Sequence, residues 1–248
     1  MNSNLYLSTG KLFLGVSIIA IGIIHVVTGH FPTGLLPVPA SLPGKEILAY
    51  LTGLLMIGAG ILIFIKRYMH YGVFAAALLY LLALLLIHIP LLVSNFHNPS
   101  EWTAIFEVIS ILSGVLVLLG SIWKRDQFKL IKTGSYIFAI GLVVFGIQHF
   151  MYAQFVAGLI PAWIPARLFW NYLVMAAFFA SAISFIIQKQ VKLSGTLLGL
   201  MFFIWVLILH LPRVTANMHT EPEWTSLFVA LAFSGIAVLI AGSAARKA

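Results

Sequence analysis

The sequence predicts an all-α polytopic membrane protein, with eight transmembrane helices arranged as two parallel four-helix-bundle repeats. The 248-residue chain is 62% hydrophobic and only 8% charged, which is far outside the range of soluble domains. Its apolar runs are long enough to cross a bilayer as helices and lack the alternation of a membrane β-barrel. Polar residues of the first half also recur in the second half at similar spacing, which indicates an internal duplication.

Eight apolar runs with few or no charges each have about the 17–25 residues that a membrane-spanning helix needs. They cover residues 12–29, 47–65, 71–94, 102–123, 133–153, 168–187, 193–212 and 224–243. The first run follows a polar start and has no convincing small-residue cleavage site. We therefore expect a retained helix there rather than a signal peptide.

The net charge of +8 is better explained by membrane topology than by nucleic-acid binding. If the helices alternate in direction, most basic residues lie on one side: Lys11, Lys66, Arg67, Lys124, Arg125, Lys129, Lys132, Lys189, Lys192, Arg246 and Lys247. Only Lys45, Arg167 and Arg213 lie on the other side. The positive-inside rule then predicts a multi-pass protein of the inner (cytoplasmic) membrane with both termini in the cytoplasm.

The duplication extends along the whole chain. The segment GIIHVVTGHFPTGLLP (22–37) matches GIQHFMYAQFVAGLIP (146–161), and LLIHIPLLVSNFHNPSEWT (85–103) matches LILHLPRVTANMHTEPEWT (207–225). Four helices per half is an even number, so both halves insert in the same orientation. We expect a first repeat at 1–123, a cytoplasmic linker at 124–132 and a second repeat at 133–248, each repeat forming a four-helix bundle.

In this topology the repeated polar residues gather at the non-cytoplasmic rim. They are the four membrane histidines His25, His88, His149 and His210, together with Glu101, Glu223, Trp102, Trp224, Lys45 and Arg167. Ionisable groups within a membrane are costly, so they indicate a functional site. We predict that the four histidines carry the chemistry and that the charged and Trp residues, with Arg213, bind the ligand.

Each of these residues also has a structural interpretation. The segment TEPE (220–223) is typical of a capping box, and Asn98 of NPSE (98–101) is a candidate N-cap. The two Trp residues suit an interfacial aromatic belt, and Lys45 and Arg167 can extend to the headgroups. Histidines near helix ends often make interhelical hydrogen bonds.

The two halves differ at several polar positions. The second half adds Arg213, Gln148 and Tyr152 where the first has Leu91, Ile24 and Thr28. Glu107 lies inside the fourth run, and its counterpart is apolar, which makes it a candidate proton relay. We expect the second half to hold the better-formed site.

Few cofactors are compatible with this sequence. The absence of cysteine excludes disulfides, thiolate metal sites and cysteine nucleophiles. The chain has no flavin, nicotinamide or iron–sulfur motif and no HxxxH or HExxH spacing, so no metal ligands are assigned. A metal bound by two His and a Glu, or a haem between two His, stays chemically open.

The second half also resembles a known family. Residues 149–183 read HFMYAQFVAGLIPAWIPARLFWNYLVMAAFFASAI, in which His-Phe, Ile-Pro-Ala-Trp-Ile-Pro and Trp-x-Tyr precede a helix rich in small residues. This pattern resembles the DoxX-like membrane proteins, which are built on a four-helix unit. The resemblance implies a tandem duplication of that unit, although residues 35–53 lack the first Trp. It also implies a link with thiosulfate:quinone oxidoreductase subunits and with membrane complexes that handle oxidative stress.

Two classes of function follow from these observations. The first is a membrane subunit of a quinone-linked oxidoreductase, with a quinone at the outer rim near His149, His210, Arg167 and Arg213, and with electrons supplied by a redox partner protein. The alternative is a non-enzymatic protein that binds or transports a lipid or small molecule, or a structural membrane subunit. In each case the lipid bilayer is the surrounding partner, and nucleic acid is not one.

Overall fold

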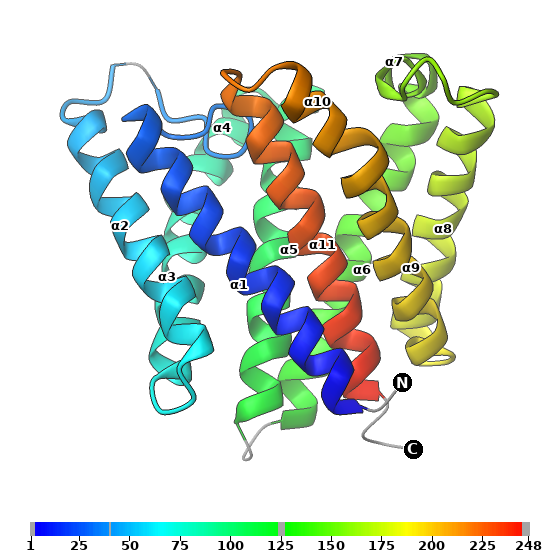
Figure 1. Cartoon of the computed structure of the whole chain (residues 1–248), viewed down its shortest axis with the longest axis horizontal. Coiled ribbons are helices and arrows are strands. Elements are labelled where there is room, and N and C mark those ends of the chain that lie inside the picture. Colours follow the sequence, from blue (N-terminus) through cyan, green and yellow to red (C-terminus); the bar gives the residue numbers. More distant parts are fainter. Residues whose placement is uncertain (1–2, 40, 124–126, 245–248) are drawn as a thin grey trace.

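The computed structural model describes residues 3–39, 41–123 and 127–244, and every regular element in those ranges is helical (Figure 1). The elements are α1 Ser3–Thr28, α2 Lys45–Phe64, α3 Met69–Ala83, η1 Leu84–His88, α4 Ile89–Ser94, α5 Pro99–Ile122, α6 Gln127–Met151, α7 Ala153–Leu159, α8 Arg167–Ile187, α9 Val191–Trp205, η2 Val206–His210, α10 Leu211–Ala216 and α11 Glu221–Ala244. The continuous helices α3–η1–α4 and α9–η2–α10 each count as one span.

Eight spans in the described residues are long and apolar enough to cross a membrane, as the sequence predicts. Each span begins before the apolar run that predicted it, because polar residues can form the first turn of a helix in the interfacial layer. Residues 127–132 of the predicted linker belong to α6, and residues 124–126 lie outside the described part of the chain. Arg246 and Lys247 also lie outside it. The short surface helix α7 has no counterpart among the predicted runs.

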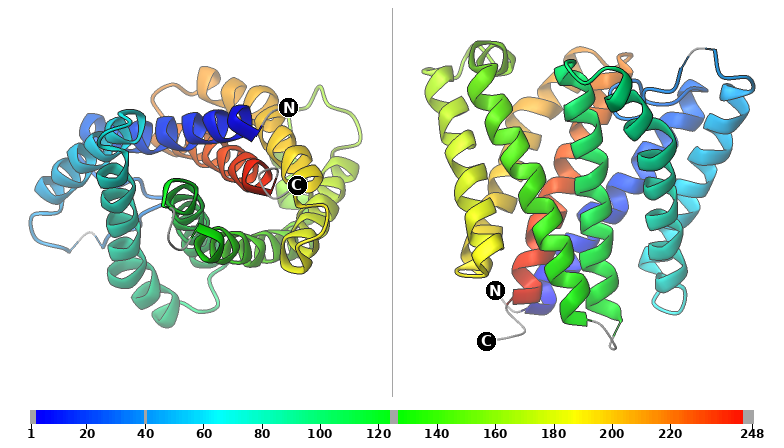
Figure 2. Two further views of the ribbon diagram at one scale, coloured as in Figure 1. Left: turned by 90° about the horizontal axis from the view of Figure 1, so that it is seen from below. Right: turned by 180° about the vertical axis from the view of Figure 1, so that it is seen from behind.

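The helices of the two halves pack across each other. The first helix of each half lies against the last helix of the other, because α1 packs on α11 and α6 packs on α5 (Figure 2). Helices α5 and α11 also touch each other, and one hydrophobic core extends through both halves. The two halves therefore share one hydrophobic core.

Small residues permit the two crossings between the halves. A Cβ atom on Gly10 of α1 would lie 2.7 Å from the backbone oxygen of Gly235 in α11. At the matching crossing, a Cβ atom on Gly134 of α6 would lie 2.7 Å from the backbone oxygen of Ser113 in α5. Close backbone approach at small residues is the usual basis of helix association in membranes. Any larger residue at Gly10 or Gly134 would force the helices apart.

All helix ends fall into two layers. The beginning of α1 and the end of α11 lie at the same end of the molecule, and α7 and α10 lie at the opposite end (Figure 1). The repeated polar residues of the sequence belong to this opposite end, which we call the rim. The rim therefore gathers the connections that follow α1, α6, α4 and α10.

A candidate ligand cavity in the second half

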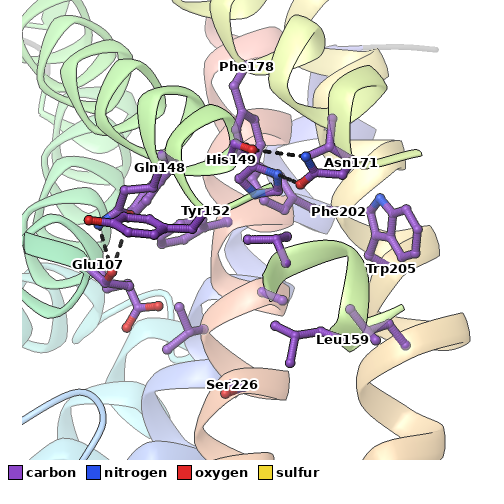
Figure 3. Close-up of a pocket in the computed structure, with 18 of the residues that line it drawn as sticks. Glu107, Gln148, His149, Tyr152, Leu159, Asn171, Phe178, Phe202, Trp205 and Ser226 are labelled. Carbon is purple, nitrogen blue, oxygen red and sulfur yellow. Dashed lines mark hydrogen bonds between the residues drawn. The ribbon is translucent and has the colours of Figure 1, made fainter. Parts of the chain in front are cut away.

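A cavity of about 660 Å³ lies near the rim of the second half, between α6, α8, α9, α11 and the neighbouring α5 (Figure 3). Its polar lining residues are Ser100, Thr103, Glu107, Gln148, His149, Tyr152, Asn171, Trp205, His210 and Ser226. The remaining wall is apolar and includes five phenylalanines. This volume lies within the range of pockets that bind small organic molecules.

Four phenylalanines from four helices form the inner wall of the cavity. The ring centroid of Phe202 lies 5.5 Å from those of Phe178 and Phe233, and Phe145 lies 5.5 Å from Phe233. Phe178 and Phe202 are stacked, and Phe202 and Phe233 meet edge to face. Such contacts fix the rings and present flat apolar faces to a ligand.

His149 is held in one orientation by Asn171 of α8. The side-chain nitrogen of Asn171 donates to the backbone oxygen of His149 at 2.9 Å, which fixes the orientation of the amide. The amide oxygen of Asn171 then accepts from Nδ1 of His149 at 2.9 Å. A neutral His149 with its proton on Nδ1 has Nε2 available as an acceptor. The counterpart of Asn171 in the first half is Ala49, so this pair is specific to the second half.

Glu107 enters the cavity from α5, the last helix of the first half. Beside it, the Gln148 amide nitrogen donates to the backbone oxygen of Pro99 at 3.1 Å and to Oγ1 of Thr103 at 3.0 Å. The Glu107 carboxyl group has no hydrogen bond or ion pair with any described residue. A carboxyl group at this depth favours either a bound proton or a ligand that hydrogen-bonds to it.

His210 reaches the cavity from the end of a π-helical turn. In η2, the N–H of Leu211 bonds to the oxygen of Val206, and in η1 the N–H of Ile89 bonds to the oxygen of Leu84. Each turn precedes a proline (Pro90 or Pro212) whose ring cannot be accommodated in a regular α-turn. The two halves thus repeat the same local distortion, each ending at a histidine. Nδ1 of His210 has no hydrogen-bond partner among the described residues.

The corresponding region of the first half is filled by its own chain. Leu35 and Leu36, in the connection after α1, are 0% and 3% exposed and belong to the main core. Their backbone N–H groups both bond to the oxygen of Pro32 in a tight turn. In the second half, the counterpart of Leu35 is Leu159 of α7, which is 38% exposed and lines the cavity.

His25 and His88 therefore do not share a cavity with His149 and His210. His25 is buried, with Nδ1 at 2.8 Å from the backbone oxygen of Ile21 and its ring edge-on to Phe31. His88 is also buried, and its ring lies close to the backbone of Leu35. The four histidines predicted to act together are divided between a packed interior and an open cavity.

The charged residues that the sequence predicts to bind the ligand lie outside this cavity. Arg213 of α10 makes a two-fold ion pair with Glu223 of α11, with N–O distances of 2.7 and 2.8 Å. Glu223 therefore joins two helices instead of closing the predicted capping box. Arg167 is exposed at the start of α8, and Lys45 is partly buried at the start of α2. Neither lines the cavity.

The repeated rim residues Trp102 and Trp224 fix the connections before α5 and α11. The indole nitrogen of Trp102 donates to the backbone oxygen of Phe96 at 2.8 Å, and that of Trp224 donates to Met218 at 2.9 Å. Asn98 accepts from the backbone N–H of Ser100, as expected of an N-cap, and also donates to Glu101 at 3.4 Å. These repeated residues hold the rim together.

Sequence reasoning missed Asn171, Ser226 and the aromatic wall. Asn171 carried a signal, because it is polar in an apolar run and has an apolar counterpart. The four phenylalanines of the cavity wall gave no such signal in the sequence, because phenylalanine is common in membrane helices. Among the described residues, no group of three His, Asp or Glu side chains is arranged to hold a metal ion.

The fold and the cavity together define a class of protein. It is a polytopic helical integral membrane protein whose second half holds, near one end, a cavity lined by phenylalanines and several polar side chains. Comparisons with models of known protein families, with curated proteins and with solved structures find no match.

Proposed function

We propose that this chain is a DoxX-like integral membrane protein that binds a quinone in the second-half cavity, as the membrane subunit of a quinone-linked redox system. The observation that carries the proposal is the oriented His149–Asn171 pair on the wall of an aromatic cavity. Both residues belong to the segment 149–183 that resembles the family. The inner membrane, with cytoplasmic termini, is part of the same proposal and rests on the distribution of Lys and Arg.

The cavity suits the chemistry of a quinone and its reduced quinol form. The flat ring packs on the phenylalanine wall. A quinol hydroxyl donates to Nε2 of His149, and the second oxygen lies towards Glu107 and Gln148, on the α5 side of the cavity (Figure 3). Reduction of a quinone takes two electrons and two protons. The electrons come from a redox partner protein, and His149 and Glu107 exchange protons with the two oxygens.

Trp205 provides a direct test, because its indole lines the cavity and a quinone quenches indole fluorescence. A short-chain ubiquinone analogue is titrated into the detergent-purified full-length protein. We expect saturable quenching that disappears in Trp205→Phe. We also expect His149→Gln to weaken binding of the reduced quinol, measured by its competition with the quinone, by about tenfold, because the quinol hydroxyl loses its hydrogen bond to Nε2.

The duplication supplies the matched control. His25→Gln alters the equivalent histidine, which does not line this cavity, and is expected to leave quinone and quinol binding unchanged. Quenching that rises without saturation, or that is equal in Trp205→Phe, would contradict the proposal. Saturable binding of phospholipid in place of the quinone would instead favour the lipid-binding alternative.

A further inference from the structure

A second cavity, of about 440 Å³, lies at the opposite end of the second half, on the side where α1 begins and α11 ends. It lies between α6, the α8–α9 connection and α11. Its polar lining residues are Lys132, Ser135, Gln188, Gln190, Lys192 and Ser243. None of them lines the quinone cavity, so this is a separate feature of the molecule.

The charge of this second cavity is positive. Lys132 comes from α6 and Lys192 from α9, and no carboxyl group is among the lining residues. Neither lysine has an ion pair with a described residue. Two amino groups that face one cavity repel each other, and an anion bound between them removes that repulsion. Lysine is a common ligand of phosphate groups.

Ser243 provides an independent indication of a polar ligand. Its side chain is 3% exposed, and Oγ has no hydrogen-bond partner among the described residues. The nearby Ser135, by contrast, donates to the backbone oxygen of Ile131 at 2.8 Å. A buried hydroxyl without a partner costs free energy, and a ligand oxygen in the cavity would satisfy it.

The surroundings of the cavity are those of the lipid boundary. Ile186 and Ile187 at the end of α8 and Leu193 at the start of α9 are exposed and flank the lining residues. Exposed apolar residues beside a basic pocket suit a molecule with an anionic head and acyl chains. In the first half, the counterparts of Ser135 and Lys192 are Lys11 and His70, so the arrangement is not repeated there.

We propose that this cavity is a binding site for a phosphate group, held by Lys132, Lys192 and the hydroxyl of Ser243. Two sources carry that chemistry, namely the headgroup of an anionic phospholipid and free phosphate. The exposed isoleucines and Leu193 favour the phospholipid.

The test measures lipid binding to the full-length protein by native mass spectrometry in detergent. Phosphatidylglycerol is titrated, with zwitterionic phosphatidylcholine as the reference lipid. Neutralising Lys132 and Lys192 in Lys132→Gln/Lys192→Gln is expected to weaken phosphatidylglycerol binding by about fivefold per lysine, or about 25-fold together. Lys189→Gln is the matched control, because this exposed lysine lies in the same connection but does not line the cavity.

The outcomes distinguish binding in this cavity from a general attraction between anionic lipids and the basic residues of the protein. An effect in the double variant that is absent in Lys189→Gln supports the site, and Ser243→Ala is expected to weaken binding without any change of charge. Equal losses in Lys189→Gln and in the double variant would overturn the proposal, as would equal affinity for the two lipids in the wild type. Inorganic phosphate distinguishes the sources: competition assigns the site to phosphate groups in general, and no competition assigns it to the phospholipid.

Discussion

At the scale of single residues, Glu107 places a carboxyl group in the second-half cavity without a partner among the described residues. Such a group lowers stability, so its removal is expected to raise it. We predict that Glu107→Val, which introduces the residue found at the counterpart position 229, stabilises the protein by about 1–3 kcal/mol. Thermal denaturation in detergent measures the change. Glu107→Gln, which keeps a polar group, serves as the control and should give little gain.

A Glu107→Val variant that is less stable than the wild type, by the roughly 2–5 kcal/mol that a core substitution typically costs, would contradict this prediction. It would mean that the carboxyl group has a partner that stabilises the fold.

The ion pair between Arg213 and Glu223 leads to a second prediction. Its side chains are 34% and 13% exposed, so water screens the pair and its contribution is modest. Arg213→Leu introduces the leucine that the first half has at the counterpart position 91. We expect this substitution to destabilise the protein by about 1 kcal/mol and to leave quinone affinity unchanged. Thermal denaturation and the quinone titration measure the two effects. In Arg213→Leu/Glu223→Gln the two losses should not add, because each single change already breaks the pair.

A fall in quinone affinity in Arg213→Leu, with little change in stability, would restore the ligand-binding role that the sequence suggested for Arg213.

Individual residues also show where sequence reasoning succeeds and where it stops. The repeat identifies polar residues that matter, and the structure gives most of them a contact: Trp102 and Trp224 hold the rim, and Glu223 pairs with Arg213. Repetition cannot distinguish a ligand-binding residue from one that joins helices, because a duplicated bundle repeats both. The differences between the halves are more informative, since Glu107 and Gln148 both reach the cavity.

At the scale of elements, each proline next to a π-helical turn determines the direction of the histidine before it. The turn holds one extra residue, so its loss would rotate the adjoining residues by about 100° around the helix axis. We predict that Pro212→Ala removes the distortion in η2, turns His210 away from the cavity and weakens quinone binding several-fold. The Trp205 titration measures the effect.

Pro90→Ala is the matched control, because it makes the same change at η1, beside the buried His88. It should leave quinone binding unchanged. Equal effects of the two substitutions would mean that His210 is not positioned by its proline.

The connection after α1 gives a second prediction at this scale. Leu35 is fully buried, whereas its counterpart Leu159 is partly exposed beside the cavity. Leu35→Ala is expected to cost about 2–5 kcal/mol, as a cavity-forming substitution in a packed core does. Leu159→Ala should cost well under half of that. Thermal denaturation of the two variants measures the stability losses. Equal losses in the two variants would show that Leu35 does not fill a packed core in the first half.

These elements were only partly predictable from the sequence. The apolar runs identified all eight spans, because twenty or so apolar residues can satisfy their backbone in a bilayer only as a helix. The π-helical turns and α7 were missed. Both depend on local packing that hydropathy does not record, although the paired His-x-Pro sequences marked the location of the turns.

At the scale of the whole molecule, the first and last helices of each half pack on the other half. The sequence predicted two repeats in the same orientation but not this exchange of partners, because hydropathy carries no information about which helices touch. Leu35 of the first half is fully buried, whereas its second-half counterpart Leu159 lines the cavity.

The measurement that tests the central claim most directly is mass-spectrometric analysis of organic extracts from the purified protein. The comparison is between wild type and Ser226→Phe, which fills the cavity, with Ser226→Ala as the control that leaves it open. The account predicts near-stoichiometric quinone in the wild type and in Ser226→Ala, and its loss in a folded Ser226→Phe. Equal quinone in all three samples, or none in the wild type, would contradict it.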